Sequence, residues 1–300
     1  MSAAEVWTVG KLLTWTTEYL KKHGSQSPRL DAEVLLAHAR ECQRIELYTA
    51  FAEEPTEEAK TAFREMVRRR SEGTPVAYLV GYKEFYSAVF EVNPDVLIPR
   101  PETEHLVVEA LDRAKQLREN RGSMQGGEQG QLRIVDVGSG SGIIAISLAK
   151  HLPHCHVTAI DISPAALEVT RRNAAKHDID ESRLAIVQGD LLSVCAADDK
   201  FDLILSNPPY VSQAEFNQLD QTVREFEPQS ALVSGPLGSE TIVQLLEQAP
   251  QHLAPDGWVI LEFSPMLAET MHTWMPAGWQ TPIVTKDYAG HARIVSVRRS

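Results

Sequence analysis

The sequence has few cysteines and fewer basic than acidic residues. Its three cysteines, Cys42, Cys155 and Cys195, are odd in number and far apart, which excludes a disulfide framework and indicates reduced thiols. Lys and Arg number 29 against 41 Asp and Glu, so the net charge is −12 and the pI about 5.3. Sequence-independent nucleic-acid binding needs a broad basic surface, so we expect no direct nucleic-acid partner.

Long hydrophobic runs are also missing. No apolar stretch approaches the roughly 20 residues that span a bilayer, and the first residues lack a signal-peptide pattern. The 300 residues, 43% hydrophobic and 23% charged, have the composition of a globular protein with one large or two ordinary domains. We expect a cytoplasmic monomer with no membrane partner.

A metal site is not expected either. The cluster His154-Cys155-His156 contains three residues of ligand type. They lie at the start of a predicted strand, where successive side chains point to opposite faces. No second cluster supplies further ligands, so we assign no metal.

Residues 1–74 predict a small all-α domain. Thr8, Ser27 and Thr56 each precede apolar residues at helical spacing and are suitable N-caps. No cluster of catalytic residues occurs in this part of the chain. We therefore assign it to substrate recognition.

Residues 75–101 predict a β-hairpin that links two domains. The residues 86–92 and 96–98 favour strands, and Asn93-Pro94-Asp95 between them favours a turn. A helix is then expected to open at Pro101. The polar, glycine-rich stretch 119–130 predicts a mobile surface loop, to which we assign no function.

Beyond this loop, strands and helices alternate. This order predicts a doubly wound α/β sheet with right-handed crossovers, so 102–300 is expected to form one Rossmann-like domain. Strands are predicted at 132–137, 157–160, 184–187, 201–206 and 258–263, a closing antiparallel pair at 283–284 and 294–297, and helices at 143–150, 164–176 and 241–253.

A glycine-rich loop follows the first of these strands. The sequence is Asp136-Val137-Gly138-Ser139-Gly140-Ser141-Gly142, directly before a helix. Glycines let the backbone turn sharply and approach a ligand closely. A dinucleotide site would have G-x-G-x-x-G spacing; the tighter G-x-G-x-G after an acid resembles the first motif of class I methyltransferases, which bind S-adenosylmethionine.

Two more acids end neighbouring strands. Asp161 follows Asp136 by 25 residues, near the roughly 20 expected for a carboxylate that binds a ribose. Its alternative is to cap the next helix, although Ser163 has the better position. Asp190 would accept from an adenine amino group while the Leu191 N–H donates to the ring, or it forms a turn.

Asn207-Pro208-Pro209-Tyr210 is the most informative motif. It follows the buried strand 201–206, and ligands of open α/β sheets bind at the carboxyl ends of strands. The two prolines stiffen the loop and remove two N–H donors. Acceptor oxygens and the flat Tyr210 ring suit a planar NH₂ group, either a carboxamide or a nucleobase amine. A plain strand-ending turn is the alternative.

With these residues placed, nearly the whole chain resembles the HemK-type release factor glutamine methyltransferases, which are protein-(glutamine-N5) methyltransferases. The stretch Pro99 to Glu104 discriminates best, because Asn-Pro-Pro-Tyr alone also resembles DNA adenine-N6 methyltransferases. One departure is the segment 263–268, which lacks the family's glycine turn and glutamine, so we assign it no role. The resemblance also rests on 29–37, 75–78 with Gly81 and Phe85, Glu227-Pro228 with Ala231-Leu232, and Asp287, Gly290 and Arg293.

The resemblance implies a seven-stranded class I methyltransferase domain, S-adenosylmethionine as cofactor, and release factors as protein substrates. The loop 136–142, Asp161, Asp190, Leu191 and Asn207 would bind the cofactor. Asn207 and the Pro208 carbonyl would accept the substrate amide hydrogens, with Pro209 and Tyr210 against its plane. Alternatives are a ribosomal-protein glutamine methyltransferase, a nucleic-acid adenine-N6 methyltransferase, a non-catalytic module that binds S-adenosylmethionine, and a dinucleotide-dependent reductase.

Overall fold

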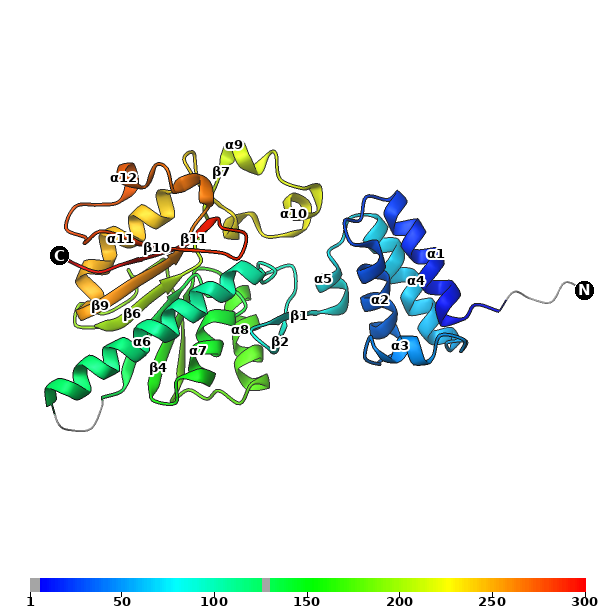
Figure 1. Cartoon of the computed structure of the whole chain (residues 1–300), viewed down its shortest axis with the longest axis horizontal. Coiled ribbons are helices and arrows are strands. Elements are labelled where there is room, and N and C mark those ends of the chain that lie inside the picture. The colour runs from blue at the N-terminus through cyan, green and yellow to red at the C-terminus, as the bar shows by residue number, and fades with distance from the viewer. Residues whose placement is uncertain (1–5, 126–129) are drawn as a thin grey trace, which may run out of the picture. The chain divides into compact units, whose positions relative to one another are not determined.

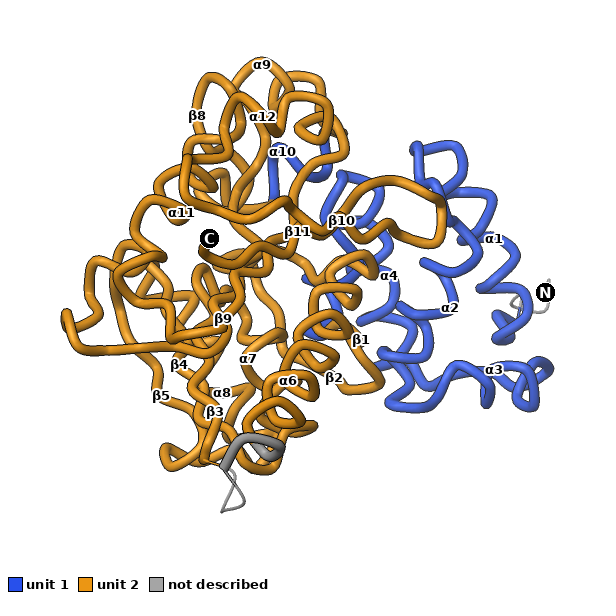
Figure 2. Tube along the Cα trace, turned by 60° about the vertical axis from the view of Figure 1, so that its left-hand side comes forward, with its two compact units in different colours: residues 1–82, 221–226 blue, residues 83–220, 227–300 orange. Residues whose placement is uncertain are grey.

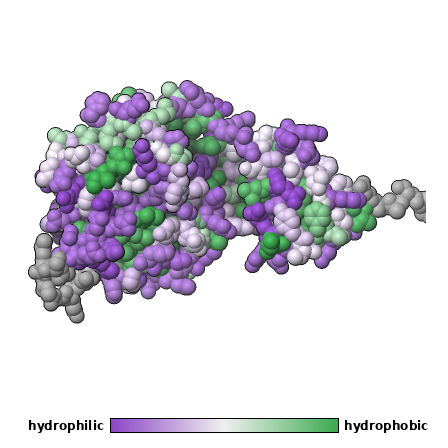
Figure 3. Space-filling model, viewed as in Figure 1, coloured by the Kyte–Doolittle hydropathy of each residue, from purple (hydrophilic) through white to green (hydrophobic). Residues whose placement is uncertain are grey.

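The computed structural model describes residues 6–125 and 130–300. The chain divides into two compact units (Figure 2): one is the chain up to Tyr82 with Gln221–Phe226, the other Lys83–Asp220 with Glu227–Ser300. The division at residues 74 and 101 stays a prediction. In the view of Figure 3 the surface is mainly hydrophilic, with hydrophobic residues in small separate patches. No helix in the described ranges is both long and apolar enough to cross a bilayer.

The first unit is helical, as predicted. Thr8 and Thr56 accept hydrogen bonds from the backbone N–H groups of Lys11 and Ala59, which confirms both as N-caps, whereas Ser27 makes no side-chain cap. The core includes Leu13, Leu35, Leu36, Phe63 and Val67. Its helices are α1 (Val9–Lys22), α2 (Pro28–Ala39), α3 (Glu46–Thr49), α4 (Glu57–Ser71), α5 (Val76–Val80) and the separate segment α10 (Gln221–Phe226).

The second unit contains a sheet of seven strands within the described residues, in the order β10-β11-β9-β6-β3-β4-β5. Strand β11 runs antiparallel to both neighbours, and the pairs β9-β6, β6-β3, β3-β4 and β4-β5 are parallel. The strands are β3 (Leu132–Val137), β4 (Cys155–Asp161), β5 (Leu184–Gln188), β6 (Phe201–Ser206), β9 (Leu253–Glu262), β10 (Ile283–Lys286) and β11 (Ala292–Val297). The predicted doubly wound sheet and its closing antiparallel pair are confirmed.

Helices cover both faces of this sheet (Figure 1). One core is formed with α6 (Glu104–Gln125), α7 (Ile143–His151) and α8 (Pro164–Lys176), and the other with α11 (Glu240–His252) and α12 (Met271–Trp274). Strand β6 is buried along its whole length, Asp202 included. Asp202 is tolerated because it accepts from Arg121 and from the Arg133 N–H. The shorter elements are β7 (Val211–Ser212), α9 (Gln213–Phe216), β8 (Val233–Gly235) and the 3₁₀ turns η1 (Pro101–Thr103), η2 (Gln229–Ala231) and η3 (Pro265–Leu267).

The predicted hairpin is wrong in its position. The strands are β1 (Tyr82–Phe85) and β2 (Ala88–Glu91), and the turn is Tyr86-Ser87 with φ of 47° and 59°. Such a turn ordinarily takes Asn or Gly, so its sequence gave no signal. Glu104 stabilises it by accepting from the Tyr86 N–H at 2.9 Å. Residues 96–98 form no strand, since the Ile98 N–H donates to the Glu227 side chain instead.

The predicted surface loop at 119–130 is also wrong in part. Helix α6 continues to Gln125, and the remaining residues 126–129 lie outside the described ones. The Arg121–Asp202 ion pair ties this last part of α6 to strand β6. That contact is between residues far apart in sequence, so the local composition gave no sign of it.

The first unit offers a stability test at Thr16. Its side chain is fully buried, and its hydroxyl has no hydrogen-bond partner. We expect Thr16→Val to raise the free energy of unfolding by about 1 kcal/mol, because a buried unsatisfied hydroxyl is replaced by a methyl group. Urea denaturation measures the change.

Thr17→Val is the matched control on the same helix. The Thr17 hydroxyl donates to the Leu13 carbonyl at 2.7 Å, so this substitution is expected to bring no gain. A Thr16→Val protein less stable than the wild type would contradict the account.

Candidate active site

The register of the parallel strands brings the predicted site residues together. Val137 at the end of β3 pairs with Ile160 of β4 on one side and with Ser206 of β6 on the other. The residues that follow these three are Gly138 after β3, Asp161 in β4 and Asn207 after β6, and all three lie at one edge of the sheet. This is the edge where ligands of doubly wound sheets bind.

The glycine-rich loop is fixed by backbone hydrogen bonds to β4. The N–H groups of Gly138 and Ser139 both donate to the Ile160 carbonyl, at 2.8 and 2.9 Å. Gly142, at φ 80°, opens α7, and a side chain there would meet Thr170 Cγ2 at 2.9 Å. The loop thus needs glycine for both conformation and space.

Asp136 lies beneath the loop and does not line the cavity described below. It is fully buried, its Oδ2 accepts from the Ala145 N–H at 3.1 Å, and its Oδ1 has no hydrogen-bond partner. Burial raises its pKa to about 7, with a smaller contribution from Asp161. In this structure Asp136 holds the start of α7, and its predicted contact with a cofactor stays a prediction.

Asp161 lies at the cavity wall and is bonded on both oxygens. Oδ2 accepts from the Gly140 N–H at 2.8 Å and Oδ1 from the Ser163 N–H at 2.9 Å. Burial raises the pKa of Asp161, and these N–H donors oppose the shift. Ser163 is the side-chain cap of α8, as expected, so Asp161 organises the loop rather than capping the helix.

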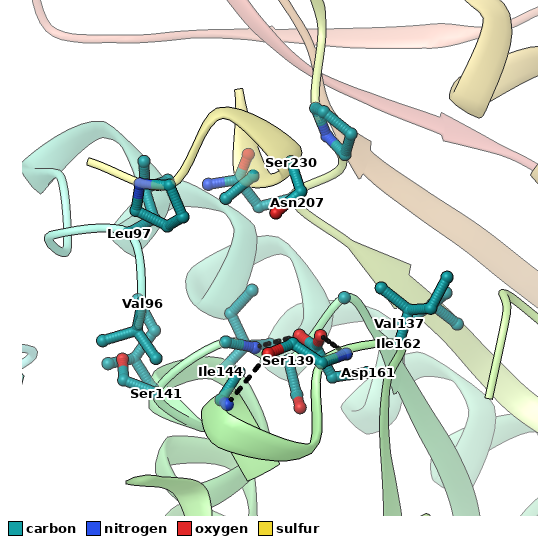
Figure 4. Close-up of a pocket in the computed structure, with 18 of the residues that line it drawn as sticks. Val96, Leu97, Val137, Ser139, Ser141, Ile144, Asp161, Ile162, Asn207 and Ser230 are labelled. Atoms are coloured by element: carbon teal, nitrogen blue, oxygen red, sulfur yellow. Dashed lines mark hydrogen bonds between the residues drawn. The ribbon is translucent and has the colours of Figure 1, made fainter. Parts of the chain in front are cut away.

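A cavity of about 370 Å³ opens above these strand ends. In Figure 4, Ser139, Ser141 and Asp161 lie at the bottom of the view, and Asn207 and Ser230 lie opposite them at the top. Of the predicted cofactor residues, the cavity is lined by Gly138, Ser139, Gly140, Ser141, Asp161, Asp190, Leu191 and Asn207, whereas Asp136 and Gly142 do not line it. Leu191 has a left-handed φ of 51°.

Several lining residues were missed by the sequence analysis, among them Leu97, Pro99, Thr103, Ile162, Ser230 and Val233. Ile162 is 61% exposed although apolar. Its place directly after a strand-ending acid was an available signal. The others lie in segments to which the sequence analysis assigned no ligand contact, and only the tertiary fold brings them to the cavity.

Asn207 also lines a second, smaller cavity of about 40 Å³. Pro208 and Tyr210 line only this one, and Pro209 lines the larger one. Asn207 thus borders both a large and a small cavity. This arrangement suits a group that contacts two reactants at once.

The first and last residues of the Asn-Pro-Pro-Tyr motif each donate a hydrogen bond to a side chain from another part of the chain. Asn207 Nδ2 donates to Thr103 Oγ1 at 3.1 Å, and the Tyr210 hydroxyl donates to Glu262 Oε1 at 3.1 Å. Burial, followed by the nearby Glu262 charge, raises the pKa of Tyr210, which keeps the phenol neutral. The bond to Thr103 engages the nitrogen end of the Asn207 amide.

One wall of the larger cavity is closed by an ion pair between distant segments. Arg100 donates to Glu227 Oε1 at 2.5 Å and to the Ile98 carbonyl at 2.9 Å. The Ile98 N–H donates to the second Glu227 oxygen at 3.1 Å. The segments around Pro99 and Pro228, both quoted above for the resemblance, therefore meet at the site.

Comparisons with known proteins agree with this geometry. Family models match at residues 11–81 (PrmC N-terminal domain) and 123–243 (methyltransferase small domain). The chain is 50% identical to a release factor glutamine methyltransferase of Rhodopirellula baltica over 98% of its length and 97% of the relative's. The chain belongs to the release factor glutamine methyltransferase family.

Other similarities support this family membership and the fold. A release factor glutamine methyltransferase of Koribacter versatilis is 39% identical over 94% of this chain and 95% of the relative. Among solved structures, the hMettl16 catalytic domain in complex with MAT2A 3′UTR hairpin 6 has a TM-score of 0.55 at 11% identity, covering 77% of this chain and 81% of that one. This last likeness shows the fold alone. The class I methyltransferase fold implied by the sequence is confirmed, and the chain is a methyltransferase.

The described residues of the protein contain no cluster of side chains suited to bind a metal ion. No group of three or more His, Cys, Asp or Glu side chains there is arranged to hold a metal ion. The cysteines are unpaired, with Cys155 buried.

The buried Asp136 predicts a pH-dependent stability. Its folded pKa of about 7 exceeds the ordinary 3.8, so the folded state holds this proton more tightly than the unfolded state. The contribution of Asp136 to stability therefore falls as pH rises from about 4 to about 7 and is then constant.

We expect Asp136→Asn to remove this loss and to be more stable than the wild type at pH 8 by ~1 kcal/mol or more. The new amide NH₂ would take the place of the unpartnered oxygen. Guanidinium denaturation of both proteins at pH 5 and pH 8 measures the difference in their free energies of unfolding. A difference between the two proteins that does not change with pH would contradict the assignment.

Proposed function

We propose that this chain transfers a methyl group from S-adenosylmethionine to the side-chain amide nitrogen of the glutamine in the Gly-Gly-Gln loop of peptide chain release factors. The observation that carries the proposal is the position of Asn207, which lines both the large and the small cavity. The names of the curated relatives support the choice of release factors as substrates.

The larger cavity fits S-adenosylmethionine. Ser139 lines it, and its buried hydroxyl has no hydrogen-bond partner, so a polar group of the ligand would satisfy it. The loop 138–141 gives close backbone approach, and Asp161 and Asp190 offer acceptors for ribose hydroxyls and an adenine amine. When bound, the cofactor would supply an electrophilic methyl group next to Asn207.

The smaller cavity suits the planar amide of a glutamine. A carboxamide nitrogen is a weak nucleophile because its lone pair is delocalised into the carbonyl. Asn207 Oδ1 and the Pro208 carbonyl would each accept one amide hydrogen, which fixes the amide plane and favours electron density on nitrogen. The prolines and Tyr210 would pack against this plane. No strong base is needed, since an N-protonated amide is very acidic.

The acceptors alone do not distinguish a glutamine amide from an adenine amine. The helical first unit is therefore assigned to docking of the protein substrate. The net charge of −12 is a poor match for a nucleic-acid substrate. A nucleic-acid adenine-N6 methyltransferase remains the competing function, and it predicts strongly salt-dependent binding to DNA or RNA.

The direct test supplies labelled S-adenosylmethionine with three acceptors: a purified release factor, the same factor with its loop glutamine replaced, and duplex DNA. We expect label on the first acceptor only. Label on DNA and not on protein would overturn the proposal in favour of the adenine methyltransferase.

Asn207→Asp tests the role of the motif. The change keeps an acceptor but removes the Nδ2–H group that donates to Thr103 and adds a charge. We expect kcat to fall about 100-fold, with a smaller change in the cofactor Kd measured by calorimetry.

Asn120→Asp, the same chemical change on the exposed side of α6, is the control for added charge and should behave as the wild type. If Asn207→Asp retains wild-type turnover with normal cofactor affinity, Asn207 does not have the proposed role.

A further inference from the structure

Helix α8 contacts the glycine-rich loop through two buried side chains, Thr170 and Asn173. They are one helical turn apart, and both are fully buried. Thr170 Oγ1 donates to the Gly140 carbonyl at 2.8 Å. Asn173 Nδ2 donates to the Ser141 carbonyl, also at 2.8 Å. Gly140 and Ser141 line the larger cavity, so these two side chains of α8 fix residues of the cavity wall.

Asn173 also bonds to strand β2. Its Oδ1 accepts from the Glu91 N–H at 2.7 Å, and its Nδ2 donates to the Glu91 carbonyl at 3.0 Å in addition to Ser141. Glu91 is the last residue of β2. The amide oxygen and the NH₂ group of Asn173 are therefore both engaged, and they join two segments that are far apart in the sequence.

The backbone partners fix the orientation of the Asn173 amide. A backbone N–H only donates and a backbone carbonyl only accepts, so the Glu91 N–H requires Oδ1, and the Ser141 and Glu91 carbonyls require the NH₂ group. A half-turn of the amide would place its NH₂ group against an N–H and its oxygen against two carbonyl oxygens. Asn173 thus has one orientation, in which it bonds the loop and the strand at once.

The segment that follows β2 forms another part of the same cavity wall. Val96 and Leu97 line the larger cavity, and Figure 4 shows them at the left of the view, above Ser141. Between Glu91 and Val96 the chain makes a compact turn, in which the Asn93 carbonyl accepts from the Val96 N–H at 3.2 Å. A shift of Glu91 would therefore move the residues of this wall.

Two other contacts between β2 and α8 are exposed. Arg172 Nε donates to Glu91 Oε1 at 2.8 Å, but the two side chains are 40% and 38% exposed, and an exposed ion pair contributes little. A ring nitrogen of His177 lies 3.1 Å from the Val89 carbonyl, also at an exposed position. Neither contact involves the glycine-rich loop. Asn173 differs from both because it is buried and bonds the loop as well as β2.

We propose that Asn173 is a positioning residue that couples the glycine-rich loop to strand β2, so that S-adenosylmethionine bound at the loop also fixes β2 and the wall segment after it. This inference rests on the cofactor of the function proposed above. A ligand that fills the cavity restrains the Ser141 carbonyl, and the Asn173 amide extends this restraint to Glu91. Thr170 bonds the loop alone, so it contributes to cofactor affinity but not to the coupling.

The first test is the cofactor affinity of Asn173→Asp in the full chain. This change keeps the shape of the side chain and the acceptor for the Glu91 N–H, but it replaces the NH₂ group by an oxygen that faces two carbonyl oxygens. We expect the Kd for S-adenosylmethionine, measured by calorimetry, to rise about tenfold or more. The kcat on a release factor at saturating cofactor should stay within about threefold of the wild type, because Asn207 is untouched.

Three variants of the same helix are the controls. Thr170→Val, which leaves the Gly140 carbonyl without its donor, should raise the Kd about tenfold, and Thr170→Ser, which keeps the hydroxyl, should restore it. Arg172→Gln removes the exposed ion pair with Glu91 and should leave the Kd unchanged.

The second test measures the coupling itself and does not depend on methyl transfer. Hydrogen exchange of the Glu91 N–H, followed by NMR, reports on its bond to Asn173 Oδ1. In the wild type we expect saturating S-adenosylmethionine to slow this exchange about tenfold. Thr170→Val and Arg172→Gln should show the same slowing once they are saturated. Asn173→Asp still accepts from Glu91 but no longer donates to Ser141, so its exchange should not respond to the cofactor. A residue that only stabilised α8 would leave the response intact.

The outcomes separate this inference from the proposed function. An active wild type, together with an unchanged Kd or a wild-type exchange response in Asn173→Asp, would overturn the inference and leave the function intact. If Asn173→Asp does not fold, the wild type decides, because a Glu91 exchange rate that ignores bound cofactor overturns the coupling. A wild type that binds the cofactor but does not methylate the release factor would overturn the proposed substrate, and the Kd and exchange measurements would still decide the role of Asn173. A wild type that does not bind S-adenosylmethionine would overturn both.

Discussion

The site depends on the parallel register of β6 with its neighbours. On one side β6 pairs with β3, which aligns Asn207 with the glycine-rich loop, and on the other it pairs with β9, which aligns Asn207 with Glu262. Parallel strands end at the same edge of a sheet, so one strand order delivers the loop, the amide and the buried carboxyl group to one place. A slip of one residue would turn the side chain of Asn207 to the opposite face of the sheet.

The walls of the cavities have a different origin. The part of the walls that faces the strand ends comes from irregular segments before α6 and before α11, which hold each other through Arg100 and Glu227. Glu227 is buried and bonded to both Arg100 and the Ile98 backbone, so neither oxygen is left unsatisfied. The regular sheet therefore positions the reacting groups, and a charged contact between loops shapes the space around them.

Most of the sheet and the helices after residue 131 were predictable because buried strands and amphipathic helices alternate and are separated by clear turn signals. The hairpin was placed wrongly because its turn is formed by Tyr86 and Ser87 in left-handed conformations that these residues rarely adopt. The extent of α6 was missed because the contact of Arg121 with Asp202 lies outside any local window. In each case a tertiary contact outweighed the local preference.

The sequence by itself determined which chemical groups stand at the strand ends: the glycines, Asp161, Asp190 and the Asn-Pro-Pro-Tyr motif. Only the tertiary structure decided which atoms of these groups face the cavities. It buried Asp136 under the loop, and it bonded Asn207 to Thr103, 104 positions away in the chain. The physical reason is that a residue type fixes what a side chain can donate or accept, whereas the direction of each hydrogen bond is fixed by partners that folding alone brings near.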